Sequence, residues 1–217
     1  MSDPQADERE QQRLARKARR QQAKRRRILA AAQTLLAEGP DRLTVAALAE
    51  VADTSPSTLY YYFPSVESVI EGLAVQLITD ETEAMVAALE REPDPIDALV
   101  AVMEARVAFY RANPQPFWTL FDQLFGLRFS AETLEEQVYP LAARTMAPLA
   151  ERLAEGQAAG TVHPDLDPRR FANLAYLTVQ GILQMTVSME LAGGAMRYPV
   201  EALLAEATAS VRRAARP

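Results

Sequence analysis

Two stretches of this sequence carry hydroxyl groups and cations at spacings that could do chemistry. Residues 53–68 read DTSPSTLYYYFPSVES and contain three consecutive tyrosines. Residues 24–27 read KRRR and place four cations in a row. Hydroxyls donate and accept hydrogen bonds, and cations neutralise phosphates. The two stretches indicate contact with a polar or polyanionic surface, provided that a helix presents the tyrosines to solvent.

The charge distribution supports a polyanion contact near the N-terminus. Residues 1–27 carry ten Lys/Arg against four Asp/Glu, whereas residues 28–72 carry one against six. Residues 73–217 carry twelve against nineteen, and the whole chain has a net charge of −6. A basic segment on an acidic body predicts that this segment makes most of the contact. The alternative interpretation is a solvated, disordered extension.

Composition excludes several classes of function. The 217 residues suffice for one large core or two small domains, and the absence of Cys excludes disulfides and thiolate chemistry. We expect no membrane span, no secretory signal, and a cytoplasmic location. His163 beside Asp165 and Asp167 suggests a metal site only weakly, because aspartates before a helix usually serve as caps. No phosphate-binding loop or Ser/His/Asp set occurs, so we predict neither enzyme activity nor a cofactor.

Nearly every segment is predicted to be helical, which gives an all-α fold class. A 3.6-residue apolar stripe marks the first clear helix, which ends at Gly39-Pro40. Thr44 is a suitable N-cap for a second, short helix. Ser55 followed by Pro56 begins a third, so SPSTLYYY is predicted to be a helix and not a strand.

Later segments complete a helical organisation with three parts. Further helices are predicted to continue to about 91 and to cover about 96–112, 131–155, 167–191 and 199–213, with another apolar segment at 117–127. The predicted parts are a basic extension (1–23), a helix-turn-helix domain (24–73) and a larger helical domain (74–217).

Residues 28–73, ILAAAQTLLAEGPDRLTVAALAEVADTSPSTLYYYFPSVESVIEGL, resemble the N-terminal domain of the TetR family of bacterial transcriptional regulators. The resemblance implies an all-helical homodimer that places one recognition helix per subunit in successive major grooves of a pseudo-palindromic operator. It further implies that residues 74–217 are a ligand-binding and dimerisation domain, and that a small molecule bound there releases the DNA. The implied partners are double-stranded operator DNA, a small-molecule effector and a second copy of the chain.

The resemblance assigns DNA contacts to the third helix, whose Leu59 and Phe63 should face the core. Base readout is assigned to Ser55, Pro56, Ser57 and Thr58. Phosphate contacts are assigned to Tyr60, Tyr62 and Thr44, and a base or sugar contact to Tyr61. The alternative is that tyrosines pack between helices, and this applies most to Tyr60, whose ring is expected to lie partly against the first helix.

Two departures from the family pattern bear on DNA binding. Asp53 occupies the turn position where the family usually has Gly, and aspartate tolerates the left-handed conformation at modest cost. Val66 stands where the family usually has a phosphate-binding Lys. We therefore expect the missing charge to come from the basic arm, which comprises Lys24, Arg25, Arg26 and Arg27, aided by Arg13, Arg16, Lys17, Arg19 and Arg20.

Large side chains in 103–146 form the candidate effector pocket that the resemblance implies. The predicted ligand-binding residues are Met103, Phe109, Phe117, Trp118, Phe121, Phe125, Met146 and Tyr176. Each of these residues taken alone also fits an ordinary core position. The composition of the cluster favours an apolar or aromatic effector.

The helix predicted over 167–191 is apolar on two faces, so both faces must be buried. One face can line the core and the other can pair with a second subunit, where Gly181 would permit close approach. The predicted dimer residues are Leu174, Thr178, Gly181, Ile182, Met185, Met189, Leu203, Leu204 and Val211. The alternative is a monomeric core helix.

Two other functions remain open at this point. The chain could be an interaction protein that kept this fold while its DNA binding weakened or was lost, which Val66 and the acidic 28–72 segment favour. It could also be an activator instead of a repressor, because no sequence feature fixes the sign of regulation.

Overall fold

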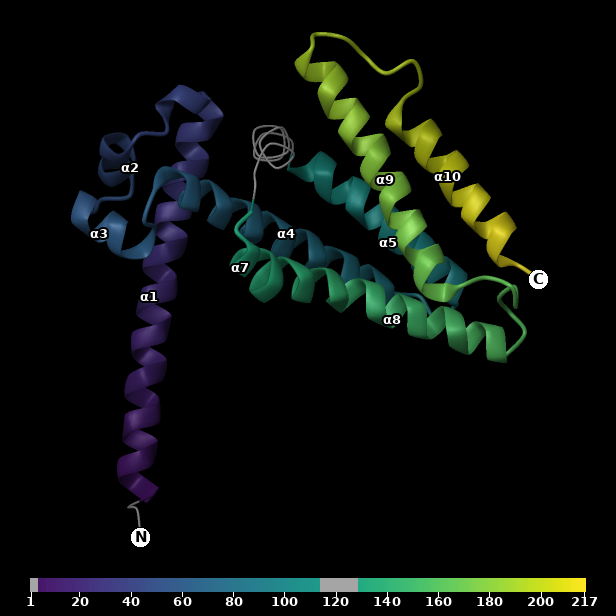
Figure 1. The fold of residues 1–217 in the computed structure, drawn as a ribbon, viewed down its shortest axis with the longest axis horizontal. Coiled ribbons are helices and arrows are strands. Elements are labelled where there is room, and N and C mark those ends of the chain that lie inside the picture. The colour runs from purple at the N-terminus through teal and green to yellow at the C-terminus, as the bar shows by residue number, and fades with distance from the viewer. Residues whose placement is uncertain (1–3, 114–128) are drawn as a thin grey trace. The chain divides into compact units, whose positions relative to one another are not determined.

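The computed structural model describes residues 4–113 and 129–217, and every regular element in those ranges is helical (Figure 1). The all-α prediction is therefore confirmed. The chain divides into two compact units, Met1–Leu73 and Ala74–Pro217. In the described ranges, no helix is both long enough and apolar enough to cross a membrane.

The first unit contains a helix-turn-helix packed on a long first helix. Its elements are α1 (Pro4–Glu38), the 3-10 turn η1 (Pro40–Arg42), α2 (Val45–Val51), α3 (Pro56–Tyr62) and the start of α4 (Val66–Arg91). The predicted stripe of α1 is buried, together with apolar residues of α2, α3 and α4; the buried set includes Ile28, Ala32, Leu35, Leu36, Leu48, Ala52, Leu59, Phe63 and Val69.

The caps predicted for the short helices are present. The Thr44 side chain accepts a hydrogen bond from the Ala47 N–H at 3.2 Å, and Ser55 accepts one from the Thr58 N–H at 3.2 Å. Gly39 has a φ of 143° and ends α1, as predicted. In each cap, the donor and the acceptor are only a few residues apart in the sequence. The sequence alone therefore indicates these contacts.

Helix α1 begins at Pro4, about twenty residues before Arg25, where the apolar pattern predicts the first clear helix to begin. The additional residues are rich in Ala, Arg, Gln and Lys, which are good helix formers. Residues 11–20 are all exposed, so no apolar stripe marks them as helical. A helix of 35 residues is about 50 Å long, so α1 presents an extended charged surface.

The second unit is a helical bundle around one apolar core. Beyond α4 it comprises α5 (Pro95–Ala112), α7 (Ala131–Thr133), the π-helical turn η2 (Leu134–Val138), α8 (Tyr139–Ala158), α9 (Pro168–Leu191) and α10 (Val200–Ala215). Helices α9 and α10 run antiparallel, side by side (Figure 1). The core is formed mainly by α5, α8 and α9, with Leu99, Val100, Leu149, Leu153, Val179, Leu183 and Val187 almost fully buried.

Candidate nucleic-acid interface and ligand pocket

Helix α3 presents two tyrosines to solvent. The Tyr60 and Tyr61 side chains are 53% and 71% exposed, whereas Leu59 and Phe63 are each 3% exposed. The prediction that Leu59 and Phe63 face the core is confirmed. Such an exposed aromatic pair beside a buried apolar pair gives α3 one face for packing and one face for a partner.

The predicted positions of Tyr60 and Tyr62 are reversed in the structure. Tyr60 is exposed, whereas Tyr62 is half-buried and its ring meets Tyr61 edge-on, with centroids 5.1 Å apart. Helical phase explains the difference, because successive residues are rotated by about 100°. Tyr62 therefore lies within about 60° of the buried Leu59, whereas Tyr60 lies about 100° from it.

The hydroxyls at the start of α3 already bond to one another. Ser55 Oγ lies 2.9 Å from Ser57 Oγ and 2.8 Å from Thr58 Oγ1. Ser55 also caps the helix, so its oxygen stabilises α3 itself. Ser57 and Pro56 are exposed, which leaves them accessible for base contacts.

The predicted basic run divides into residues with different partners. Arg25 donates to the Tyr62 carbonyl oxygen at 3.3 Å and stacks over the Phe63 ring at 4.3 Å. Partial burial lowers the pKa of the Arg25 guanidinium. Three of the four cations expected to face DNA, namely Lys24, Arg25 and Arg27, therefore contact the helix-turn-helix itself. In the part of the chain that the structure describes, Arg26 is exposed and has no hydrogen-bond or ion-pair partner.

Arg27 and Lys24 bind the turn between α2 and α3. Arg27 donates to the Asp53 carboxylate at 2.6 Å, and Lys24 Nζ lies 3.4 Å from the Asp53 carbonyl oxygen. Asp53 has a φ of 45°, the left-handed conformation expected for it. The hydrogen bond from Arg27, followed by its positive charge, lowers the pKa of the Asp53 carboxyl.

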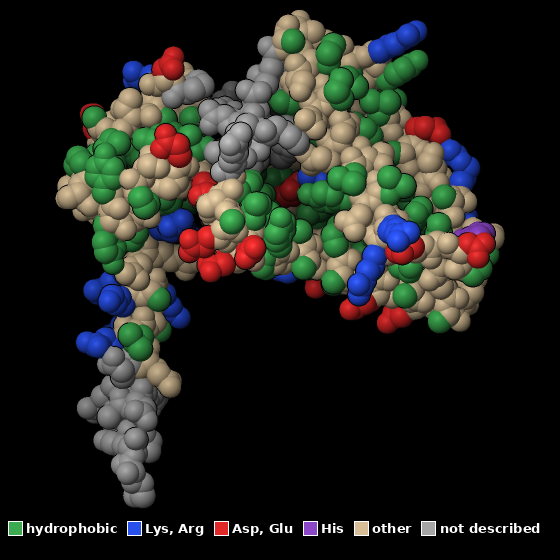
Figure 2. Space-filling view, viewed as in Figure 1, with side chains coloured by type: hydrophobic (Ala, Val, Ile, Leu, Met, Phe, Trp, Pro, Cys, Tyr) green, Lys and Arg blue, Asp and Glu red, His purple; other side chains and the backbone are tan. Residues whose placement is uncertain are grey.

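A groove with basic walls lies between α1 and the end of α3. It has a volume of about 640 Å³, and Gln21 Nε2 approaches the Tyr61 hydroxyl at 3.4 Å across it. Figure 2 shows Lys and Arg side chains along α1. The lining residues are Gln12, Arg13, Arg16, Lys17, Arg20, Gln21, Tyr61 and Tyr62. The sequence suggested these cations as auxiliary contacts but did not predict the groove, because it depends on α1 being helical before residue 24.

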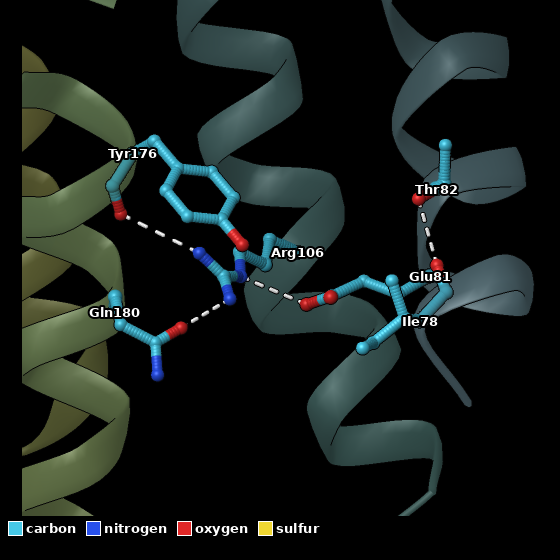
Figure 3. A network of polar contacts seen from close by, with 6 residues as sticks. All are labelled: Ile78, Glu81, Thr82, Arg106, Tyr176 and Gln180. Carbon is cyan, nitrogen blue, oxygen red and sulfur yellow. Dashed lines mark hydrogen bonds and ion pairs between the residues drawn. The ribbon is translucent and has the colours of Figure 1, made fainter. Parts of the chain in front are cut away.

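The second unit contains a buried polar cluster that sequence analysis missed (Figure 3). Arg106 of α5 donates from Nε to Glu81 Oε1 of α4 at 2.8 Å, and its guanidinium lies 3.9 Å from the Tyr176 ring centroid. The guanidinium also donates to Gln180 Oε1 and, at 3.4 Å, to the Tyr176 carbonyl oxygen. Arg106 occupies the same helical stripe as Leu99, a periodicity that could have revealed its burial.

Three of the predicted ligand residues meet beside this cluster. Met103, Met146 and Tyr176 line a small enclosed cavity together with Arg106. Burial raises the pKa of the Tyr176 hydroxyl. Phe109 is half-buried on α5 and does not line the cavity. Four other predicted residues lie outside the described ranges, namely Phe117, Trp118, Phe121 and Phe125.

Residues 28–73, which hold α2, α3 and the start of α4, match the family model for bacterial regulatory proteins of the tetR family. Residues 28–73 therefore form a helix-turn-helix of the TetR family of transcription regulators.

Two nucleoid occlusion factors are similar to part of this chain. The nucleoid occlusion factor SlmA of Vibrio vulnificus is 30% identical over 120 residues, and its Vibrio cholerae counterpart is 30% identical over 119. These matches cover 55% and 54% of this chain, but only 60% and 59% of the respective relatives. The chain thus matches less than two thirds of the length of either protein.

Solved structures share the fold over most of the chain. FadR of Bacillus subtilis, solved with stearoyl-CoA, is 19% identical with a TM-score of 0.66 and covers 87% of this chain and 97% of its own. A Saccharomonospora viridis protein solved with choline is 19% identical with a TM-score of 0.67, covering 89% and 97%. At these identities the likeness concerns the TetR-type fold alone.

One face of α9 is apolar and is not covered by other described residues. Leu174 and Leu177 are 61% and 60% exposed, and Met185 is also exposed. The opposite face is buried in the core, so the predicted two-sided character is present. A groove of about 380 Å³ brings five predicted residues together, namely Leu174, Thr178, Ile182, Leu203 and Val211.

Other predicted dimer residues lie differently. Leu204 packs on the core and lines the side of α10 that faces α5. Val211 is mostly buried within its own chain. Both positions follow from the packing of α10 on α5. Met189 is half-buried, whereas Gly181 is exposed and a Cβ there would meet nothing within 4 Å. Leu177 was not among the predicted dimer residues, but it is 60% exposed and belongs to the same apolar face.

Proposed function

We propose that this chain is a homodimeric, ligand-responsive transcriptional repressor that binds a pseudo-palindromic operator and leaves it when a small apolar effector binds. Residues 24–73 form the DNA-binding domain, residues 1–23 a basic extension, and residues 74–217 the effector and dimerisation domain. The observation that carries the proposal is the exposed Tyr60–Tyr61 face of α3 within a TetR-family helix-turn-helix.

The basic groove supports a phosphate contact next to this face. Val66 supplies no cation at the start of α4, and Lys24, Arg25 and Arg27 contact other parts of the protein. The exposed cations that remain for the DNA backbone include Arg26, Arg16, Lys17, Arg19 and Arg20 of α1. Tyrosine hydroxyls beside such cations can position phosphates without reading sequence.

The dimer is supported by the exposed apolar face of α9 and the adjoining groove against α10. Two copies related by a two-fold axis would bury this face in a self-complementary interface, as homodimers usually do. A dimer also supplies the paired recognition helices that a pseudo-palindromic site requires.

The proposal is tested by fluorescence anisotropy with labelled DNA that flanks the protein's own gene. The full chain should bind specifically, and a variant lacking residues 1–23 should bind more weakly with a flatter salt dependence. An unaltered salt slope would exclude the basic extension from the contact. A reporter under the bound promoter then distinguishes repression from activation by the sign of the change.

A second function is favoured by the charge of the first unit. Residues 28–72 carry one Lys/Arg against six Asp/Glu, and Val66 replaces the expected cation. These features support an interaction protein with weakened DNA binding, and the similar SlmA proteins are named as nucleoid occlusion factors. If the folded dimer causes no specific change in the anisotropy of the flanking DNA, this second function is favoured.

A further inference from the structure

The Arg106–Glu81 pair is an uncommon feature for the interior of a helical bundle. Arg106 is 4% exposed and Glu81 is 6% exposed. Removing two charges from water costs several kcal/mol per ion, and apolar residues of similar volume often stabilise such a site equally well. Stability alone therefore gives little reason for this pair, and a buried charge beside a cavity is a candidate for ligand recognition.

The guanidinium of Arg106 is not matched by a full two-pronged carboxylate contact. Glu81 accepts at Nε, while the two terminal nitrogens donate to neutral acceptors, the Gln180 amide oxygen and the Tyr176 carbonyl oxygen. The contact to the carbonyl oxygen is long, at 3.4 Å. Guanidinium groups bind carboxylates most strongly through two parallel hydrogen bonds. Arg106 therefore retains capacity for a better-placed carboxylate.

The cavity next to Arg106 is aliphatic and nearly filled. Its present volume is about 10 Å³, which is room for about one water molecule. Three methionines, Met85, Met103 and Met146, form part of the wall. Methionine side chains are unbranched and rearrange readily, so this wall can yield to a flexible chain. Tyr176 is the one aromatic residue among the described residues of the lining.

We propose that Arg106 anchors the carboxylate of an aliphatic acid, which takes the place of Glu81 while its chain displaces the methionines. The inference rests on the proposed function, because it names the chemistry of the effector. The head group must be an anion. A cation would lie against the guanidinium, and a neutral head group would give up the charge-assisted bond with Glu81 for a weaker one.

The exchange has a consequence for α4. Glu81 is the α4 residue in this cluster, while Arg106 belongs to α5 and both Tyr176 and Gln180 belong to α9. A ligand carboxylate on Arg106 would detach α4 from this cluster. Ligand affinity and the Glu81–Arg106 bond are then linked, so weakening the bond should strengthen ligand binding.

The test compares three probes with the same ten-carbon chain and different head groups. Decanoate, decan-1-ol and decyltrimethylammonium are titrated below their micellar concentrations into the full chain, with calorimetry and thermal unfolding as readouts. Decanoate should bind and raise the unfolding temperature, whereas the other two should bind at least about tenfold more weakly. Equal binding of decan-1-ol, preference for the cation, or no binding of decanoate would overturn the proposal.

Glu81→Gln is the decisive variant. It removes the competing charge but keeps the shape, so decanoate affinity should rise roughly tenfold, the size expected for one charge-assisted hydrogen bond. The exposed Glu83 provides the matched control, and Glu83→Gln should leave decanoate affinity unchanged. An unchanged or reduced affinity in Glu81→Gln would overturn the exchange of carboxylates.

A double variant guards against misfolding. Arg106→Met alone would leave Glu81 buried without its cation, whereas Glu81→Gln with Arg106→Met removes both charges. The double variant should lose its preference for decanoate over decan-1-ol, and a retained preference would overturn the proposal. If the double variant does not fold, Glu81→Gln decides alone. Operator affinity measured without any probe separates the two proposals, because it tests DNA binding independently of Arg106.

Discussion

Arg27 of α1 donates a 2.6 Å hydrogen bond to the carboxylate of Asp53, the residue that turns the chain from α2 into α3. Lys24 approaches the carbonyl oxygen of the same residue. Two cations thus hold the turn on α1, and Asp53 within the turn has a φ of 45°. This arrangement positions the recognition helix, but it also neutralises a cation that would otherwise be available to phosphate.

Asp53→Asn should therefore tighten operator binding. Asparagine tolerates the left-handed conformation, and the variant frees Arg27, so the log–log salt slope should steepen by about 0.9. Anisotropy at several salt concentrations measures it. Asp41→Asn, at an exposed acid in η1, makes the same charge change away from the turn and should give a smaller effect.

The effect of Asp53→Asn should not depend on pH near neutrality. Arg27 lowers the pKa of the Asp53 carboxyl, so the carboxylate stays charged and the pair is lost only as pH falls through that lowered pKa. The affinity difference between wild type and variant should be constant from about pH 6 to about pH 8. A difference that disappears within this range would contradict the role of the carboxylate.

Tyr61→Phe should weaken operator binding more than Tyr62→Phe. The Tyr61 ring is the more exposed of the two, and loss of one hydroxyl contact of about 1 kcal/mol corresponds to about a fivefold loss of affinity. Both variants keep the ring, so unfolding temperatures should remain unchanged. If both leave affinity and salt slope as in wild type, neither hydroxyl contacts a phosphate.

Arg25 and Arg26 are sequence neighbours with opposite expected roles. Arg25→Ala should destabilise the first unit by about 1–2 kcal/mol, because it removes the stack on Phe63 and the bond to the Tyr62 carbonyl oxygen. Arg26→Ala should leave stability unchanged and reduce operator affinity and its salt slope. Urea unfolding and anisotropy on both variants check the contrast, and identical behaviour would contradict it.

Association of two copies is tested on α9. Leu174→Glu combined with Leu177→Glu places charges on the exposed apolar face and should weaken the dimer at least about a hundredfold. Ala142→Glu, at an exposed position of α8 and therefore away from the apolar face of α9, is the control and should leave the dimer intact. Light scattering after size exclusion measures the mass, and a dimer that survives the double change would place the interface elsewhere.

Local chemistry was what the sequence predicted best. Thr44, Ser55 and Asp167 were each recognised as N-caps, and each side chain accepts from a backbone N–H three residues later. Such contacts depend only on neighbouring residues. For the same reason, the ends of the third helix and the end of α4 at Arg91 agree with the structure.

Contacts between distant segments could not be predicted from the sequence. Glu81 and Arg106 are 25 positions apart, and Gln180 is 74 from Arg106, so only packing brings them together. The helical structure of the basic extension, residues 1–23, was not predicted because its described residues show no apolar face. Arg25 and Arg27 were assigned to DNA because a run of cations does not indicate which of its members face protein.

The open space above Gly181 has a consequence for how the protein responds to its own concentration. Alanine at an exposed helix position would stabilise the lone subunit by about 1 kcal/mol relative to glycine. In the proposed dimer, close approach of the second copy at Gly181 would make folding and association parts of one equilibrium. By mass action, the unfolding temperature of this protein would then rise as more of it is present.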